Sequence, residues 1–554
     1  MRRYTFATML LVAAGLQAQV INVNNTDGTT LPLDTKAVSE ITFDEAKKIV
    51  TLSMNEGERH SFHTDKVEDI SKTGNKQEKL EYSLAPTVSF DSNDKKSYNE
   101  VTETIITDEL IDESGDFVEN FTVSYVIDIQ FTENDVAVSG NTSVVTYTKD
   151  GAHLVITGTK GKTAYVVSGK SGNGSLKIYS PKKFQLVLCG LDLTNSAGPA
   201  INIQTGKTVY LTVEEGSTNS LCDGATYNAP VLSSDGITYE DQKGTLFSEG
   251  QLIFDGTGTL NVTSLGGHGI CSDDYIRIRS GNINIKNAAK DGFHTNDKLM
   301  ISRTAEHAPV INITAANDGI DCGKGEVIID AGKTTIISGG EAIKAVYEAT
   351  EPDPLIVPKA TINGGYVEFT TTGDKSSGIK TNGEFVQNGG IVHGTVKGNG
   401  SKVINCDKSI TFNNGKVTGF CEGTVLNDTT SAGGIKCEGN FTLNNGTIAM
   451  KCSGKGAKGL NCKIAMIKGG EATLLSEAEN FNGADDDDSK SVAVDADNLI
   501  VTGGRTVLSA YSYAVSTTNA NLTNGILHAI SQNATAFKNG ATQKGGWLMI
   551  KEAE

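Results

Sequence analysis

The chain has 554 residues, among them 62 glycines and 9 prolines, and a formal net charge of −18. Its length allows a large core or several domains, and this composition suits a β protein with short strands and many turns. The negative charge excludes nucleic-acid binding through a broad basic surface. It also disfavours an acidic polymer as a ligand unless a cation lies between the two.

The N-terminus has the features of a secretory signal peptide. Arg2 and Arg3 precede an apolar run that ends near Ala18. We expect residues 1–18 to be removed and the protein to be secreted, periplasmic or held at the cell surface. No cysteine follows Ala18 directly, so a lipid anchor at that point is not expected. No later apolar run reaches the roughly 18 residues that a membrane-spanning helix needs.

Three further segments are expected after the signal peptide. Residues 19–72 contain two short strand patterns and predict a small N-terminal β module whose role the sequence does not show. Residues 73–126 begin polar and charged, which predicts a linker followed by leading strands. Residues 127–554 are expected to form the main domain.

A repeat of about 23–25 residues runs through the main domain. Between its landmarks lie strands with alternating apolar residues, such as NINIK at 282–286. Three strands of about five residues and three turns fill one repeat, which predicts an all-β parallel β-helix, a solenoid of stacked coils. The leucine and asparagine consensus of a leucine-rich repeat is absent, and a propeller blade needs about 40 residues. The landmark is one apolar residue per repeat, most often after a glycine: positions 201, 247, 270, 293, 320, 343, 379, 404, 435 and 460.

Three segments interrupt the repeat and are expected to form loops. Residues 347–360 carry three of the nine prolines, which cannot donate hydrogen bonds to a strand ladder. Residues 223–243 and 472–490 are similar excursions. The run Asp485–Asp488 in the last of them is interpreted as a solvated loop tip.

The cysteines follow the repeat. Cys322, Cys406, Cys437 and Cys462 each stand two residues after a landmark, on the side of the strand that faces the interior. We therefore expect buried thiols. Stacked cysteines lie about 4.8 Å apart, so disulfides at Cys421–Cys452 or Cys437–Cys462 stay the alternative.

Ionisable residues recur at two positions of the repeat. The corner position, two residues before the landmark, holds His268, Asp291, Asp318 and Glu341, and each Asp-Gly pair there predicts a turn with positive φ. The outward position, one residue after the landmark, holds Cys271, His294, Asp321, Lys344 and Lys380. Asp273, Asp274 and Asp297 follow a few residues downstream.

Stacked carboxylates at this spacing predict a bound cation. They repel by roughly 3–4 kcal/mol per adjacent pair at an effective dielectric near 20. Calcium relieves this repulsion and accepts oxygen ligands in irregular geometry. The alternative is an acidic stripe screened by water and by Lys290, Lys344 and Lys380. The candidate metal ligands are Asp291, Asp318, Asp321, Glu341, Asp273, Asp274 and Asp297.

The same columns supply a candidate ligand-binding face and a candidate base. The face consists of His268, His294, Asp321, Lys344 and Lys380. In a lyase, calcium would acidify the C5 proton of a uronate, and Lys344 or Lys380 would remove it.

An ordered set of motifs resembles a known family. These are VLCGLDLTNSAGPAINI (187–203), LIFDGTGTLNVTS (252–264), HGICSDD (268–274), AAKDGFHTND (288–297) and AANDGID (315–321). Over about residues 127–470 the chain resembles exported bacterial carbohydrate-binding proteins with a right-handed parallel β-helix, similar to polysaccharide lyases of pectin. The resemblance implies binding of a plant-type polysaccharide such as pectin or cellulose, with calcium on the helix and without established lyase activity.

The chain departs from the Asp-Gly-Ile motif at His268 and Glu341, and the later coils at Ile435 and Leu460 lack the preceding aspartate, so the expected metal sites are confined to about residues 268–345. The sequence thus predicts a secreted carbohydrate-binding protein that is assisted by calcium. A calcium-dependent polysaccharide lyase is the first alternative, and a structural surface protein or adhesin is the second.

Overall fold

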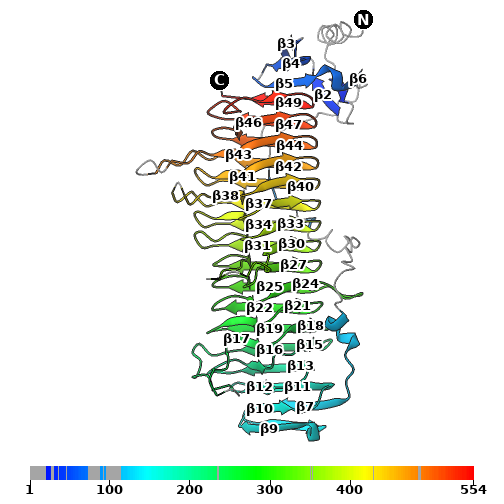
Figure 1. Ribbon diagram of the computed structural model, residues 1–554, viewed down its shortest axis with the longest axis vertical. Coiled ribbons are helices and arrows are strands. Elements are labelled where there is room, and N and C mark those ends of the chain that lie inside the picture. Colours follow the sequence, from blue (N-terminus) through cyan, green and yellow to red (C-terminus); the bar gives the residue numbers. More distant parts are fainter. Residues whose placement is uncertain are drawn as a thin grey trace. The chain divides into compact units, whose positions relative to one another are not determined.

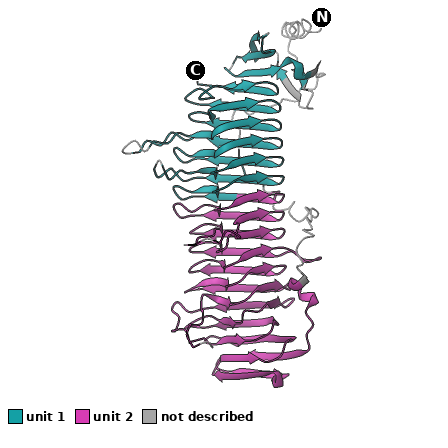
Figure 2. Ribbon diagram, in the orientation of Figure 1, with its two compact units in different colours: residues 1–91, 394–554 teal, residues 92–393 magenta. Residues whose placement is uncertain are grey.

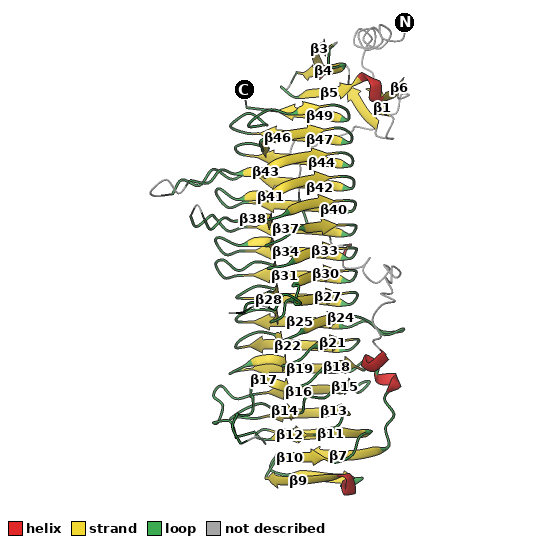
Figure 3. Cartoon of the chain, in the orientation of Figure 1, coloured by secondary structure: helices red, strands yellow, loops and turns green. Residues whose placement is uncertain are grey.

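The computed structural model describes residues 20–25, 30–34, 37–44, 46–55, 57–72, 88–91, 93–94, 114–233, 236–349, 351, 353–427, 429–483 and 488–553. The expected signal peptide, most of the expected linker and three of the four aspartates at 485–488 lie outside these residues. Two compact units are present, Met1–Asp91 with Gly394–Glu554 (unit 1) and Ser92–His393 (unit 2) (Figure 2). Short strands joined by turns make up both units (Figure 3).

Unit 2 is a parallel β-helix with three strands in each coil (Figure 1). One coil consists of β20 (His268–Ser272), β21 (Ile276–Ile278) and β22 (Asn282–Ala288). Each pairs in parallel with the strand three places later in the chain. The following coils contain β23 (Phe293–Thr295), β24 (Lys298–Ile301), β25 (Val310–Ala315), β26 (Ile320–Cys322), β27 (Glu326–Ile329), β28 (Lys333–Ser338), β29 (Ile343–Ala345), β30 (Lys359–Ile362), β31 (Tyr366–Thr371), β32 (Ile379–Thr381) and β33 (Glu384–Gln387).

The earlier part of unit 2 begins with two antiparallel pairs, β7 with β8 and β9 with β10, before parallel coils take over. Its elements are η3 (Ser114–Asp116), η4 (Val118–Asn120), β7 (Tyr125–Phe131), β8 (Val136–Gly140), η5 (Thr142–Val144), β9 (Val145–Asp150), β10 (His153–Gly158), β11 (Thr163–Ser171), β12 (Ser175–Tyr179), β13 (Phe184–Thr194), β14 (Ile201–Gln204), β15 (Val209–Val213), β16 (Thr218–Cys222), β17 (Gly244–Ser248), β18 (Leu252–Asp255) and β19 (Thr259–Ser264).

Alternation along the strands builds the core of each coil. In β22, Ile283 and Ile285 are buried while the residues between and beside them reach solvent, and β25 repeats the pattern with Ile311 and Ile313. Register pairing places each isoleucine over its counterpart in the next coil. The interior is therefore a set of apolar columns that run from coil to coil, and the predicted all-β parallel solenoid is confirmed.

Two residues depart from the predicted registration of the repeat. Leu246, and not Phe247, pairs with the landmark Ile270, so the predicted series is one residue out of step at that point. Phe247 pairs with Cys271, which was expected to point outward but is fully buried. The ammonium group of Lys243 lies over the Phe247 ring, 5.7 Å from its centroid, so the end of the 223–243 excursion covers this part of the coil.

Unit 1 contains further parallel coils. Its strands beyond residue 393 are β35 (Lys402–Cys406), β36 (Ile410–Phe412), β37 (Lys416–Cys421), β38 (Gly433–Cys437), β39 (Asn440–Leu443), β40 (Thr447–Cys452), β41 (Lys458–Ile467), β42 (Glu471–Ser476), β43 (Val492–Val501), β44 (Arg505–Ala510), β45 (Val515–Ser516), β46 (Asn519–Leu522), β47 (Ile526–Ser531), β48 (Thr542–Gln543) and β49 (Trp547–Lys551). β34 (Ile391–Val396) lies at the boundary of the units.

The N-terminal strands complete unit 1. They are β1 (Val20–Asn25), β2 (Thr30–Asp34), β3 (Val38–Asp44), β4 (Ile49–Met54), β5 (Arg59–His63) and β6 (Val67–Lys72), with η2 (Thr64–Lys66). β5 pairs antiparallel with β49, the last strand of the coils. Trp547 on β49 is fully buried, with its ring 5.2 Å from that of Phe62 on β5. These strands therefore cover the edge of the final coil.

All nine cysteines are free thiols. Cys322, Cys406, Cys437 and Cys462 are buried, as the repeat predicts. Cys421 and Cys452 are register partners on β37 and β40 and are also buried. Among the described residues there is no helix with the length and apolar character that a membrane span requires.

Candidate functional site

The ionisable columns lie on five strands of unit 2, one from each of five successive coils. Parallel pairing aligns the landmarks of β20, β23, β26, β29 and β32, and each of these residues is buried. The neighbouring outward positions are aligned by the same register, so His294, Asp321, Lys344 and Lys380 stand over one another. Apolar anchoring on one side of each short strand thus fixes a row of polar groups on the other side.

At the corner, each side chain accepts the backbone N–H of the next corner residue. Nδ1 of His268 lies 3.3 Å from the amide nitrogen of Asp291, Oδ1 of Asp291 lies 3.0 Å from that of Asp318, and Oδ1 of Asp318 lies 2.8 Å from that of Glu341. This ladder satisfies backbone donors at the bend between strands. The corner acids therefore have a structural role whether or not they bind a cation.

The Asp-Gly corner does not adopt the predicted turn geometry. Gly319 does not have positive φ. A Cβ atom at this position would lie 2.6 Å from the carbonyl oxygen of Ala342 and 2.3 Å from Cγ2 of Ile336. The glycine is needed because stacked coils approach closely here, and the prediction of a left-handed turn was wrong.

Asp291, Asp318 and Asp321 come together as one group. One carboxylate oxygen from each lies within 4.8 Å of the others. Lys344 supplies a partial counter-charge, with Nζ 3.6 Å from Oδ2 of Asp318 and 3.4 Å from Oδ1 of Asp321. Burial, followed by the charges of Glu341 and Asp291, raises the pKa of Asp318 to about 8. Near neutral pH Asp318 therefore retains its proton, and its ionisation would add a third negative charge to the group.

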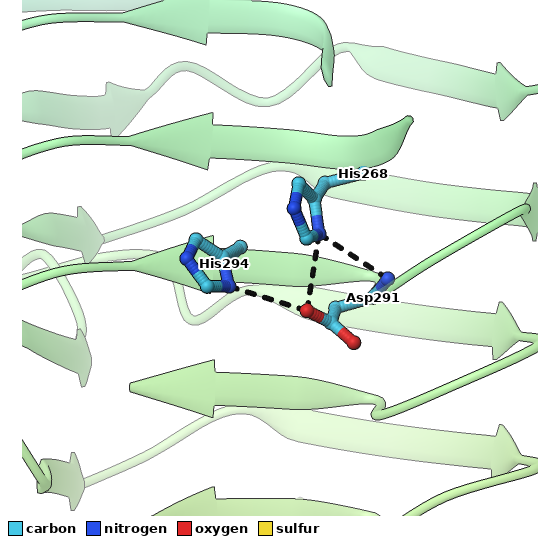
Figure 4. A group of neighbouring side chains, drawn as sticks. All are labelled: His268, Asp291 and His294. Atoms are coloured by element: carbon cyan, nitrogen blue, oxygen red, sulfur yellow. Dashed lines mark hydrogen bonds and ion pairs between the residues drawn. The ribbon is translucent and has the colours of Figure 1, made fainter. Parts of the chain in front are cut away.

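His268, Asp291 and His294 form a second group that shares Asp291 (Figure 4). Oδ2 of Asp291 lies 3.0 Å from Nδ1 of His268 and 3.2 Å from Nδ1 of His294. The two imidazole rings stack with centroids 4.3 Å apart. His294 also approaches Asp321, with 3.2 Å between Nδ1 and Oδ2.

Opposing effects set the protonation of this second group. Burial lowers the pKa of His268. For His294 burial acts in the same direction, but hydrogen bonds to Asp291 and Asp321 outweigh it and raise the pKa to about 9. Burial tends to raise the pKa of Asp291, yet the hydrogen bonds with His268 and His294 hold it well below its ordinary value.

Glu341 acts on Asp318 through its charge but also has a lysine partner of its own. Nζ of Lys380 lies 3.0 Å from Oε1 of Glu341. For Lys344, burial lowers the pKa, but the charges of Asp321 and Asp318 outweigh it and raise the value. A lysine held in its protonated form does not suit the role of general base that a lyase reaction requires.

The other predicted ligands lie elsewhere on the coils. Asp273 joins Asp241 and Glu249, with ligand atoms within 4.8 Å, and Lys243 bridges two of these acids at 2.6 Å from Asp273 and 2.8 Å from Asp241. This ammonium group already takes the place of a cation there. The sequence did not predict the role of Asp241. This residue belongs to the 223–243 insertion, and the repeat does not show where an insertion returns to the coils.

Asp274 and Asp297 are register neighbours with other partners. Asp274 accepts a hydrogen bond from the side chain of Gln251, and Asp297 forms an ion pair with Lys324. Neither is in the three-carboxylate group. The structure therefore brings together three of the seven predicted metal ligands.

The donor set of Asp291, Asp318 and Asp321 fits calcium better than softer metals. It consists of carboxylate oxygens alone, which hard cations prefer. These acids would hold the ion from one side, and the solvent-facing side of the row would leave room for water or a ligand oxygen. Such an ion would replace the proton of Asp318 and offset the charges of the three carboxylates.

Comparison with known proteins assigns the chain to a family. Residues 150–480, more than half of the chain, match the family model described as carbohydrate-binding domain-containing protein. The chain belongs to this family. The matched segment includes every residue of the two groups described above.

Two individual proteins are similar to parts of the chain. A carbohydrate-binding domain-containing protein of Acetivibrio thermocellus is 29% identical over 129 residues, which are 22% of this chain and 42% of that relative. The chain thus spans about two fifths of the length of this curated relative. A solved structure of a polysaccharide lyase-like protein from C. thermocellum, a gadolinium derivative, covers 54% of this chain and 95% of its own, with 21% identity and a TM-score of 0.33.

Proposed function

We propose that this protein binds a pectin-like polyuronate along the outward row of β20–β32, with calcium held at Asp291, Asp318 and Asp321. The observation that carries the proposal is the row itself. Within the family-matched segment, a three-carboxylate group stands beside two lysines on successive coils. A chain with a net charge of −18 needs such local positive groups, or a cation, to hold an acidic glycan.

The spacing of the row suits an extended ligand. Parallel strands lie about 4.8 Å apart, so a polymer lying across the coils meets an ionisable side chain at each step. His294, Asp321, Lys344 and Lys380 all retain partial solvent exposure. The two lysines would pair with uronate carboxylates as exposed charges, which favours specificity and association rate more than affinity.

Calcium would connect the acidic group to the acidic ligand. This ion takes six to eight oxygen ligands, more than the three carboxylates supply. Uronate carboxylates and water would provide the rest, and Lys344 would move towards the ligand as the ion takes over its role. Binding of the polysaccharide would then depend on calcium.

We also propose that the protein acts after export. Its support is the pattern of residues 1–18, with Arg2 and Arg3 before an apolar run. Polysaccharides of this kind are extracellular polymers, so a binding role requires that location. Immunodetection in cell fractions, with a cytoplasmic marker as control, tests this.

A pull-down with polygalacturonate tests the function. The chain should bind in the presence of calcium and lose at least tenfold in affinity with a chelator. Asp318→Asn should show the same loss with calcium present. Asp192→Asn is the matched control, because Asp192 is an exposed acid paired with Lys170 on another coil. Binding that is indifferent to chelator and to Asp318→Asn would contradict the calcium site, and formation of unsaturated uronate products would establish a lyase instead.

A further inference from the structure

The two histidines beside Asp291 are a donor set of a different chemical kind from the three carboxylates. Imidazole nitrogen is a poor ligand for calcium and a good one for zinc and similar divalent transition metals. Both rings present Nδ1 to the same carboxylate oxygen, and one ligand atom from each of the three residues lies within 4.8 Å of the others (Figure 4). We propose that His268, Asp291 and His294 form a site for a zinc-class divalent cation, separate in selectivity from the calcium group.

Two of the three ligand separations fit a small tetrahedral ion. With metal–ligand bonds of about 2.0–2.1 Å, two ligands of a tetrahedral zinc ion stand about 3.3 Å apart. The observed separations from Oδ2 of Asp291 are 3.0 Å to His268 and 3.2 Å to His294. Calcium accepts similar separations, because its longer bonds are shared among six to eight ligands, so the imidazole donors and not the spacing determine the selectivity.

Nδ1 of His268 faces both the backbone nitrogen and the carboxylate of Asp291. Nδ1 of His268 lies 3.3 Å from the backbone nitrogen of Asp291, whose N–H it can accept. Nδ1 has a single lone pair, so it either accepts this N–H or, when protonated, donates to Oδ2 of Asp291 at 3.0 Å. A metal ion at Nδ1 would take up that lone pair and share Oδ2, so metal–ligand bonds would replace one long hydrogen bond.

Neighbouring groups orient the Asp291 carboxylate. Its Oδ1 accepts hydrogen bonds from Nδ2 of Asn317 at 2.6 Å and from the backbone N–H of Asp318 at 3.0 Å. Oδ2 is thereby directed to the two imidazoles. Such outer hydrogen bonds to a ligating carboxylate are a regular feature of metal sites.

The site remains open to solvent on one side. The side chains of His268 and His294 are 12% and 22% exposed, while that of Asp291 is 3% exposed. Three protein ligands with a fourth position open is the arrangement of zinc sites that exchange water for a ligand. The fourth position faces the same row that is proposed to hold the polysaccharide.

Zinc titration of the full chain, without a polyhistidine tag and in excess calcium, tests the proposal. Metal ions compete with protons for imidazole nitrogens, so the titration is run at about pH 8. We expect one zinc equivalent to bind, and cobalt in its place to give the visible spectrum of a tetrahedral ion. His268→Ala and His294→Ala should each weaken zinc binding by about 100-fold, and Asn317→Ala, which loosens the carboxylate, by about tenfold.

Three variants distinguish this site from zinc binding at a surface histidine and from the calcium group. His307→Ala removes an exposed histidine on a loop and should leave zinc affinity unchanged. Asp318→Asn should lose calcium but retain zinc. His268→Asp places at this corner the residue type that the next two coils carry, and should exchange zinc preference for calcium. The proposal is overturned if the cobalt spectrum shows no tetrahedral ion, or if the folded histidine variants bind zinc as tightly as the parent chain.

Discussion

Oδ1 of Asp318 accepts the backbone N–H of Glu341 at 2.8 Å, across the gap between two coils. The same carboxylate lies against Asp291 and Asp321. One side chain therefore serves the stacking of the coils and, when ionised, adds a third negative charge to the group. These two roles can be separated by an amide, which keeps an acceptor oxygen and removes the charge.

We expect Asp318→Asn to stabilise the calcium-free protein. Burial and the neighbouring carboxylates disfavour the charged form of Asp318, and an amide avoids that cost; with the contact to Lys344 lost, the net gain should be roughly 1–3 kcal/mol. Calcium should raise the melting temperature of the parent chain and not that of the variant. Thermal melts with calcium and with chelator provide the measurement, with Asp192→Asn as control. A variant that melts lower than the parent in chelator would show that the charge itself stabilises the corner.

Lys380 is expected to contribute to glycan binding through its charge. Its side chain is 36% exposed, and it stands next to Lys344 in the outward row. Lys380→Ala should weaken binding to polygalacturonate about three- to tenfold and reduce the dependence of binding on salt. Lys170→Ala, which removes an exposed lysine with a single carboxylate partner, is the matched control. Equal losses in the two variants would argue against a local site.

Much of the site is predictable because equivalent residues of successive repeats occupy the same place in successive coils. Once Ile270, Phe293, Ile320 and Ile343 are recognised as equivalent, their flanking residues must stack, and the register shows that they do. Prediction failed where the chain leaves the repeat. Asp241 reaches Asp273 from the 223–243 insertion. The burial of Cys271 likewise depends on residues outside its own strand.

Gly319 shows a different limit. An Asp-Gly pair predicts positive φ from local preference alone, but here the glycine is required by a neighbouring coil. Close approach between segments 23 residues apart leaves no mark in a single repeat. The place of a side chain in the stack does not show what it binds, so the binding roles of these side chains stay predictions.

His528 should make the stability of the final coils depend on pH. Burial lowers its pKa from 6.5 to about 4. The unfolded chain therefore binds a proton at higher pH than the folded chain, so stability is present above about pH 6.5 and falls as the pH drops towards 4, by up to about 3 kcal/mol. Hydrogen exchange of β47 and β49 at several pH values measures this.

The matched variants for this test are His528→Gln and His307→Gln. The first removes the buried titrating group and should flatten the loss of protection between pH 6.5 and 4. The second removes an exposed histidine and should not. The same pH profile in the parent and in His528→Gln would assign the effect to another group.

Trp547 is expected to be a major source of stability at the end of the coils. It is fully buried and packs with Phe62, Leu52 and Val50 of the N-terminal strands. Trp547→Ala should cost about 3–5 kcal/mol in unfolding free energy, since it leaves a large cavity. Denaturant unfolding followed by circular dichroism provides the value. Tyr147→Ala, at an exposed aromatic residue, is the control and should change stability by less than about 0.5 kcal/mol.

The N-terminal strands should keep the chain from associating through its last strand. β5 occupies the edge of β49 by antiparallel pairing, with Phe62 opposite Trp547. Removal of residues 1–72 would expose the hydrogen-bonding groups of β49 and the apolar surface around Trp547, which is the kind of edge that recruits another chain. Light scattering coupled to gel filtration should show concentration-dependent oligomers for the shortened chain and a constant mass for the parent. Because an open strand edge is the cause, a proline replacing Ile550, whose N–H alternates with that of Trp547 and so points away from β47, should reduce the association in the shortened chain. A shortened chain with the same constant mass per chain as the parent would show that the coils protect their own end.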